Sequence, residues 1–399
     1  MFMTNMAISI VLYILLFVSA PFVSDFFHRV ELTALVRATG LILFFNALSI
    51  TQVTILTKKI DFKTKTKASL ISAVISGIIG IGMAFCGYGV WALVAQMVLR
   101  QLLYSLVLWV LNSWWPSWKI SISSFKYMWG FGWKLLISGL LDRIWSEAYQ
   151  GVVGKFYTPA TLGQYTRAQQ FASIFSSNIT GIVQRVSFPV LADIQDDKER
   201  MIEGYRKVIK ITMFVTAITM LLLAAIAEPF IFCLIGPQWK QAVNILPILC
   251  ISFSLYPLHA INLNMLQVLG RSDLFLYIEI IKKVVAIIPI SLGIFVGIYW
   301  MLIASVFTGF IAYLLNSFYT GQKLGYTSWK QLKDIAPSYG IGFLVSLAVY
   351  FIKFLDLNVW LVLSLQLIVG FSVIIIICEI IRQEEYQEIK KIIFKMINK

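Results

Sequence analysis

Long apolar segments alternate with short polar connectors along almost the whole chain. A helix that crosses the hydrocarbon core of a bilayer needs about 20 predominantly apolar residues. Because lipid offers the backbone no hydrogen-bond partners, such segments fold as helices. The pattern predicts an all-α polytopic membrane protein with twelve transmembrane helices, at residues 5–27, 34–56, 68–87, 90–113, 129–154, 166–189, 208–227, 242–268, 282–297, 299–320, 337–355 and 359–381.

The composition agrees with this pattern. Hydrophobic residues make up 59% of the 399 residues and charged residues 13%, whereas soluble domains have about 45–50% and about 25%. This difference excludes a soluble enzyme with a single membrane anchor. The four cysteines lie inside apolar segments without a close-spaced pair. We therefore expect no disulfide framework, no metal site and no cofactor.

The net charge of +14 comes mostly from basic residues in alternate connectors. Loops rich in Lys and Arg stay on the cytoplasmic side of a membrane, so we expect both termini in the cytoplasm and no nucleic acid partner. In the tail at 382–399, apolar Ile389, Ile392, Ile393 and Met396 are set against the lysines, which is typical of an amphipathic helix on an anionic leaflet, with a solvated tail as the alternative. The basic connectors are 58–67, 119–126, 198–210, 271–283 and 323–333, and the opposite connectors carry only Arg29, Lys155, Lys240 and Lys353.

Three short matches recur at a spacing of 208 to 212 residues. They are Pro21-Phe22 with Pro229-Phe230, Asp61 with Asp273, and WALVA at 91–95 with WMLIA at 300–304. Repeats in the same membrane orientation form lobes related by an axis along the membrane normal. The second copy starts two helices before the counterpart of the first helix, so we expect about 80 further residues ahead of Met1 in a complete protein of this type. The predicted parts are an incomplete four-helix lobe at 1–126, a six-helix lobe at 127–320, two additional helices at 321–381 and a basic tail at 382–399.

Several longer stretches carry a family resemblance. They are ILTKKIDF at 55–62, GYGVWALVAQ at 87–96, GKFYTPATLGQYTRA at 154–168, FPVLADIQDDKERMIEGYRK at 188–207, AEPFIFCLIGPQW at 227–239 and YPLHAINLNMLQVLGRSDLFLYIEIIKK at 256–283. On these stretches the chain resembles the Wzx-type polysaccharide or lipopolysaccharide flippases of the multidrug/oligosaccharidyl-lipid/polysaccharide exporter superfamily. Members of that family normally begin two helices earlier.

The resemblance implies a transporter with two lobes and alternating access, in the inner membrane of a bacterium. Its substrate would be a polyprenyl-pyrophosphate-linked oligosaccharide, moved from the cytoplasmic to the outer leaflet for O-antigen, capsule or exopolysaccharide synthesis. Membrane lipids and other glycan-assembly proteins are the further partners that it implies. A proton or sodium gradient would drive the movement.

A few ionisable residues fall near the middle of predicted spans, where charge is costly and usually faces a polar cavity. Arg100 lies one turn after Gln96 on the same helix face, and Arg143 lies one turn before Glu147, close to Asp142. We expect Arg100 and Arg143 to bind the pyrophosphate or an acidic glycan. Asp142 and Glu147 are candidates for ion coupling, and interhelical ion pairs that only fix packing are the alternative.

Other polar residues have a functional and a structural interpretation. Lys134, Arg37 and Arg167 are further candidates for substrate binding, although near helix ends they can, like Arg185, extend to the headgroups. His259 is a candidate for a proton relay. The alternative is a buried histidine that is hydrogen-bonded to nearby backbone. The acidic group Asp193, Asp196 and Asp197 resembles a metal site, but a solvated turn is the favoured interpretation.

Two other function classes compete with a flippase. A membrane polymerase or ligase of surface-glycan assembly generally needs a large outer loop or an acidic motif at a helix end, and the longest outer connector, 228–241, is short. A small-molecule exporter of the same superfamily would take cations, whereas the ionisable residues of the spans are mostly basic. An ATP-driven exporter is excluded for this chain because it lacks a phosphate-binding G-x-x-x-x-G-K-[ST] loop.

Overall fold

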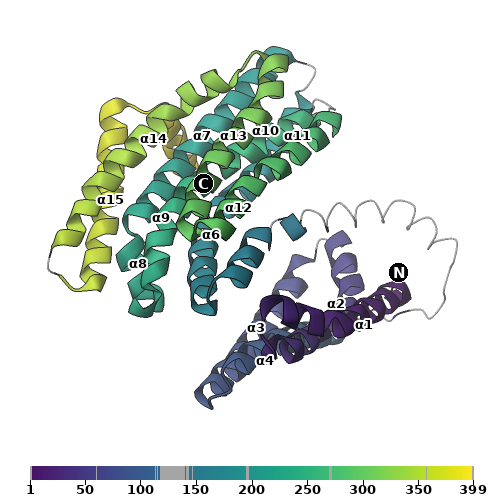
Figure 1. Cartoon of the computed structure of the whole chain (residues 1–399). Coiled ribbons are helices and arrows are strands. Elements are labelled where there is room, and N and C mark those ends of the chain that lie inside the picture. The colour runs from purple at the N-terminus through teal and green to yellow at the C-terminus, as the bar shows by residue number, and fades with distance from the viewer. Residues whose placement is uncertain are drawn as a thin grey trace. The chain divides into compact units, whose positions relative to one another are not determined.

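The computed structural model of the chain describes residues 2–59, 61–112, 147–194, 197–268, 272–355 and 357–397, with the isolated positions 114, 116, 140 and 143–145. These residues form helices and connectors without any strand (Figure 1). Nine helical segments in this part of the chain are long and apolar enough to cross a membrane. The expectation of an all-α polytopic membrane protein is therefore confirmed. The chain divides into two compact units, Met1–Arg143 and Ile144–Lys399.

The N-terminal unit contains α1 (Phe2–Phe27), α2 (Glu31–Lys58), α3 (Phe62–Phe85) and α4 (Val90–Leu111), at the first four predicted spans. Helix α1 packs on α2, and α4 packs on both α2 and α3. Small residues let α3 approach its neighbour closely, since its buried positions fall four residues apart at Ala68, Ser72, Ser76 and Gly80. A Cβ atom on Gly80 would lie 2.9 Å from the Cβ of Gln96 in α4.

The C-terminal unit is a larger helical bundle. Helical residues 147–156 lead into α6, and α7 packs on α14 and α9, while α13 packs on α12 and α10. Its helices are α6 (Pro159–Asp193), α7 (Lys198–Ala225), α8 (Ala227–Ile235), α9 (Lys240–Ser254), α10 (Tyr256–Val268), α11 (Ser272–Val285), α12 (Ile287–Phe295), α13 (Ile298–Leu324), α14 (Ser328–Tyr350), α15 (Val359–Ile381) and α16 (Glu384–Ile397), with 3-10 turns at Pro237–Trp239 and Phe351–Phe354.

Two of the predicted spans are interrupted helices. The span at 242–268 is divided into α9 and α10 at Leu255, because Pro257 has no N–H to donate to the Phe253 carbonyl. That carbonyl accepts a hydrogen bond from the Ser176 hydroxyl of α6 instead, at 2.8 Å. A side chain from a neighbouring helix thus satisfies the backbone group that the proline leaves unpaired, as membrane helices with proline require.

The predicted span at 282–297 is wrong in its start. The helix begins at Ser272 with α11 and continues after a break at Ala286 as α12. Pro289 contributes to the break, since it cannot donate to the carbonyl of residue 285. The prediction began at Lys282 because this lysine and Lys283 resemble a basic connector, yet both lie within the last turn of α11.

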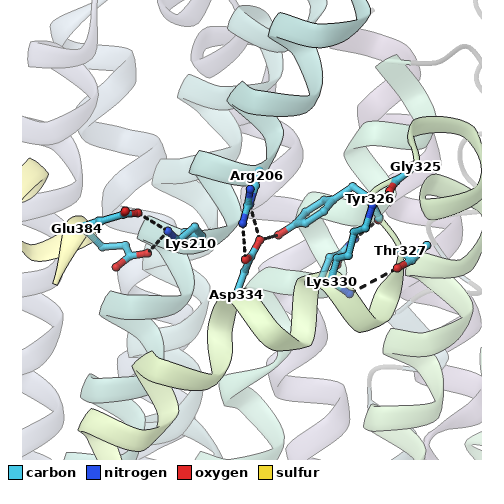
Figure 2. Close-up of polar contacts among 10 residues, drawn as sticks. Arg206, Lys210, Gly325, Tyr326, Thr327, Lys330, Asp334 and Glu384 are labelled. Atoms are coloured by element: carbon cyan, nitrogen blue, oxygen red, sulfur yellow. Dashed lines mark hydrogen bonds and ion pairs between the residues drawn. The ribbon is translucent and has the colours of Figure 1, made fainter.

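Ion pairs join several helices at the end of the C-terminal unit that carries its basic connectors, which we call the basic end. Figure 2 shows Arg206 of α7 paired with Asp334 of α14, and Lys210 of α7 paired with Glu384 of α16. Lys210 also lies 3.0 Å from Glu385, whose side chain is only 2% exposed. The tail contains a helix, α16, as predicted, and its acidic first turn lies against α7.

Candidate functional site

A cavity of about 360 Å³ lies within the C-terminal unit, and we call it the inner pocket. Its walls come from the helical segment before α6 and from α6, α9, α11 and α13. The lining residues are Trp145, Tyr149, Tyr165, Gln169, Leu249, Ser252, Phe253, Glu279, Lys282, Lys283, Ala286, Leu302, Ser305, Thr308, Gly309 and Ala312. The inner pocket thus combines aromatic rings, hydroxyl and amide groups, and charged side chains.

The inner pocket lies halfway along the candidate membrane spans that form it. Ser252 and Phe253 are near the midpoint of the span Pro237–Leu266, and Ser305 to Ala312 are near the midpoint of the span Ile298–Leu324. Charges at this depth are costly, by about 2.5–3.5 kcal/mol each on insertion scales. The charged residues of the inner pocket therefore need partners or a ligand.

Among the residues that the structure describes, helix α11 supplies all the charge that lines the inner pocket. Glu279 accepts a hydrogen bond from the Lys282 ammonium, and the two side chains are 25% and 17% exposed. Residues three apart are neighbours on a helix surface, so the pair forms within one turn. Lys283 lines the same cavity. The sequence predicts these three residues in the basic connector 271–283 and not in a site, although the polar residues Arg271 to Asp273 mark an earlier start for the helix.

The uncharged walls of the inner pocket are held by hydrogen bonds. Gln150 donates to the Oε1 atom of Gln169 at 3.0 Å, which fixes the Gln169 side chain. The hydroxyls of Ser305 and Thr308 donate to carbonyls of their own helix, at 2.7 and 3.3 Å. A hydroxyl that donates to its backbone still has lone pairs that accept hydrogen bonds. The wall formed by α13 can therefore accept hydrogen bonds from a ligand's hydroxyl groups.

His259 lies in α10, outside the lining of the inner pocket. Its Nδ1 atom is 3.2 Å from the Nδ2 atom of Asn316 in α13. An amide nitrogen only donates, so Nδ1 is the acceptor and the proton of the neutral ring is assigned to Nε2. The histidine thus has a side-chain partner on a neighbouring helix, and its role as a proton relay stays a prediction.

Comparisons with known proteins agree with the helical pattern and with the family resemblance. The model of the family described as "Polysaccharide biosynthesis protein" matches residues 1–244, more than half of the chain. The chain belongs to this family. The resemblance to polysaccharide flippases is thereby confirmed at the level of the family.

Individual relatives cover a large part of the chain. The teichuronic acid biosynthesis protein TuaB of Bacillus subtilis is 29% identical over 276 residues, which are 68% of this chain and 57% of TuaB. The succinoglycan biosynthesis transport protein ExoT of Rhizobium meliloti is 23% identical over 73% of this chain and 59% of its own length. The lipopolysaccharide biosynthesis protein WzxC of Escherichia coli is 21% identical over 72% of this chain and 59% of its own. The matched region thus spans a little over half the length of these relatives.

A solved structure has the same fold. The lipid II flippase MurJ in an inward closed conformation superimposes with a TM-score of 0.75 at 17% sequence identity. The match covers 95% of this chain and 82% of MurJ. At this identity the likeness concerns the fold alone, and it fits the predicted architecture of the superfamily.

The predicted site residues of this family member lie in different surroundings. Arg100 is exposed near the middle of α4 and lines a second cavity, in the N-terminal unit, with Ser72, Gln101 and Tyr104. Arg143 is exposed and Glu147 is half-buried. Substrate binding by Arg100 and Arg143 and ion coupling by Glu147 stay predictions.

Arg37 and Arg167 have contacts that favour a structural role. The Arg37 guanidinium lies 4.1 Å from the centre of the Phe17 ring, and its Nε atom donates to the Phe17 carbonyl at 3.3 Å. Arg167 donates to Gln170 at 2.9 Å and lies 5.8 Å from the Trp239 ring. Their role in substrate binding stays a prediction. Lys134, Asp142 and Asp196, and the side chains of Arg185 and Asp193, lie outside the residues that the structure describes.

Proposed function

We propose that this protein is a flippase that moves a polyprenyl-pyrophosphate-linked oligosaccharide from the cytoplasmic to the outer leaflet of a bacterial inner membrane. The proposal is supported by the family, by the fold shared with a lipid flippase, and by the names of relatives in surface-polysaccharide synthesis. The observation that carries it is the inner pocket, where Lys282 and Lys283 line a cavity whose other walls include the middle of the candidate spans Pro237–Leu266 and Ile298–Leu324.

The chemistry of the inner pocket suits the head of such a lipid. A pyrophosphate is a compact anion, and lysine binds phosphate oxygens through charge-assisted hydrogen bonds. Trp145, Tyr149 and Tyr165 offer rings for the apolar faces of sugars and polar tips for their hydroxyl groups. The lipid tail would stay in the bilayer while the head crosses within the protein. The basic end would face the cytoplasm, as the positive-inside rule requires.

The proposed movement is alternating access, in which two lobes rock around a site near the middle of the membrane. Arg100, Arg143 and Lys134 are further candidates to hold the anionic head during this movement. A proton or sodium gradient is the proposed energy source. A small-molecule exporter of the same superfamily is the second candidate, and lysines in the inner pocket make it less favoured because they repel cationic substrates.

The test removes the lysines of the inner pocket. In a strain whose own flippase gene is deleted, we expect the double variant Lys282→Ala with Lys283→Ala to lower surface polysaccharide about tenfold or more, since a charge-assisted hydrogen bond contributes about 1.5–3 kcal/mol. Protein abundance is measured in the same cells. The matched control is Lys323→Ala, an exposed lysine in the last turn of α13, which should export normally.

Normal polysaccharide export by the double variant would contradict the proposal that these lysines hold the substrate. Equal losses of export and of protein abundance would favour the structural alternative, in which the lysines only support packing. Export of small cationic dyes by the wild type, without any effect on surface polysaccharide, would favour the small-molecule exporter.

A further inference from the structure

Packing alone does not explain the ion pair between Glu279 and Lys282. Both residues line a cavity, and neither side chain is exposed enough to be well solvated. Without a ligand, the carboxylate and the ammonium neutralise each other at a depth where either charge alone would be costly. In this pair the Glu279 carboxylate also competes with any other anion that would bind Lys282.

We propose that an anionic ligand in the inner pocket replaces Glu279 as the partner of Lys282, and that the Glu279 carboxylate then takes up one proton. The inference rests on the proposed function, since it takes the pyrophosphate head of the substrate as the anion. Anion binding and proton binding are thereby linked at a single pair of side chains on α11.

The physical reason is the repulsion between two anions beside one lysine. A phosphate oxygen that reaches Lys282 lies close to the Glu279 carboxylate, because the two side chains are already in contact. Water screens this repulsion poorly in the interior of a bundle. Protonation converts the carboxylate into a neutral acid, which removes the repulsion and supplies an O–H donor to the phosphate. The proton comes from the surrounding solution, and no other bond is made or broken.

Other titratable groups around the pair are less suited to this role. Tyr149 and Tyr165 line the same cavity, but tyrosine ordinarily titrates near pH 10 and stays neutral. Lys283 is a cation and offers no carboxylate to protonate. The α9 and α13 walls contribute only uncharged residues to the cavity. Glu147 lies outside the lining.

His259 in α10 is the remaining candidate to take up the proton. Its Nδ1 atom already accepts from Asn316, so its ring would have to gain a proton at that same atom and lose this contact. A variant of His259 belongs in the test for this reason.

The experiment uses the full chain in lipid nanodiscs with inorganic pyrophosphate as the probe. Isothermal titration calorimetry at pH 7, in two buffers with different ionisation enthalpies, gives the number of protons taken up for each pyrophosphate bound. We expect the wild type to take up about one proton more than Glu279→Gln, since linked protonation needs an ionisable group. The comparison between the two proteins cancels the protonation of the pyrophosphate itself.

Four further variants, His259→Asn among them, complete the design. Glu199→Gln, an exposed glutamate in the first turn of α7, should behave as the wild type. Glu279→Asp should restore part of the proton uptake, which shows that a carboxylate and not the bulk of the residue is required. Lys282→Ala should lower pyrophosphate affinity about tenfold. Thermal unfolding of each variant confirms that it is folded.

Each outcome has a distinct meaning. Equal proton uptake by the wild type and Glu279→Gln, with binding that still depends on Lys282, overturns the inference and leaves the proposed function intact. Loss of the extra proton only in His259→Asn also overturns it. Pyrophosphate binding that is absent, or unchanged by Lys282→Ala, overturns the inference together with the proposed lysine site.

Discussion

The Arg206 guanidinium donates two hydrogen bonds to the Asp334 carboxylate, from Nε to Oδ2 at 2.6 Å and from Nη2 to Oδ1 at 2.7 Å. The Tyr326 hydroxyl donates to the same carboxylate at 2.7 Å. Asp334 is 12% exposed, whereas Arg206 is 54% exposed. A two-fold contact of this kind has more geometric specificity than a single lysine pair. It joins α7 to α14 at the basic end (Figure 2).

Removal of the arginine should weaken this junction. We expect Arg206→Ala to lower stability by about 1 to 2 kcal/mol, because solvent around the exposed arginine reduces the value of the pair while Asp334 is left with only Tyr326 as a donor. Thermal unfolding of the purified protein measures the change. Arg200→Ala, an exposed arginine near the start of the same helix, is the control. Equal losses in both variants would contradict a specific role for the pair.

Docking of α16 on α7 should depend on pH. The hydrogen bond from Lys210 lowers the pKa of Glu384 below its ordinary value, which is about 4.3. Because the folded pKa is the lower one, the contribution of this contact is fully present above about pH 4.3 and is lost as the pH falls through the folded pKa. Spin labels on Arg200→Cys and Lys391→Cys should keep one distance from pH 8 to 5 and separate below about pH 4. Separation near pH 6 would indicate that another group controls docking.

The close approach of α3 and α4 should make Gly80 intolerant of a side chain. Gly80→Ala adds a Cβ atom 2.9 Å from the Cβ of Gln96, and forced displacement in a packed interface costs about 1–3 kcal/mol. Gly82→Ala in the same helix is the control, because no atom lies within 4 Å of its added Cβ. Apparent melting temperatures compare the two. A Gly80→Ala protein as stable as Gly82→Ala would show that the helices separate without strain.

Removal of the Ser176 hydroxyl should lower the stability of the protein more than removal of the Ser177 hydroxyl. Ser176→Ala leaves the Phe253 carbonyl without the donor that replaces the missing N–H of Pro257, and an unsatisfied buried acceptor costs about 1–3 kcal/mol. Ser177→Ala removes a hydroxyl that bonds only within its own exposed helix turn, and stability should change little. The measurement is thermal unfolding, and similar melting temperatures for the two variants would rule out this role for Ser176.

The lengths of the apolar segments predicted most of the fold. The four helices of the N-terminal unit agree with their predicted spans to within a few residues at most ends, because polar connectors such as Lys58 to Lys67 separate them clearly. The start of α11 was missed because three charged residues in its last turns resemble a connector. Two of them, Glu279 and Lys282, pair within one helix turn, and hydropathy does not detect pairing.

The candidate site was harder to predict than the fold. Mid-span position singled out Arg100 and Arg143, whereas the inner pocket depends on which faces of five helical segments meet, and one sequence does not contain that information. The contact of Arg37 with Phe17 shows the same limit, since both residues occupy ordinary positions on their own helices. The acidic first turn of α16 is visible in the sequence as Glu384 and Glu385, but its partners on α7 are about 175 residues away.

The break at Ala286 divides what would otherwise be one helix into α11 and α12. In a continuous helix each turn is bonded to the next along the whole length. Here Pro289 supplies no N–H for the carbonyl of residue 285, so this bonding is interrupted beside the inner pocket, which Ala286 itself lines. The turn that carries Glu279 and Lys282 therefore belongs to a separate, shorter helix from α12, which packs on α13.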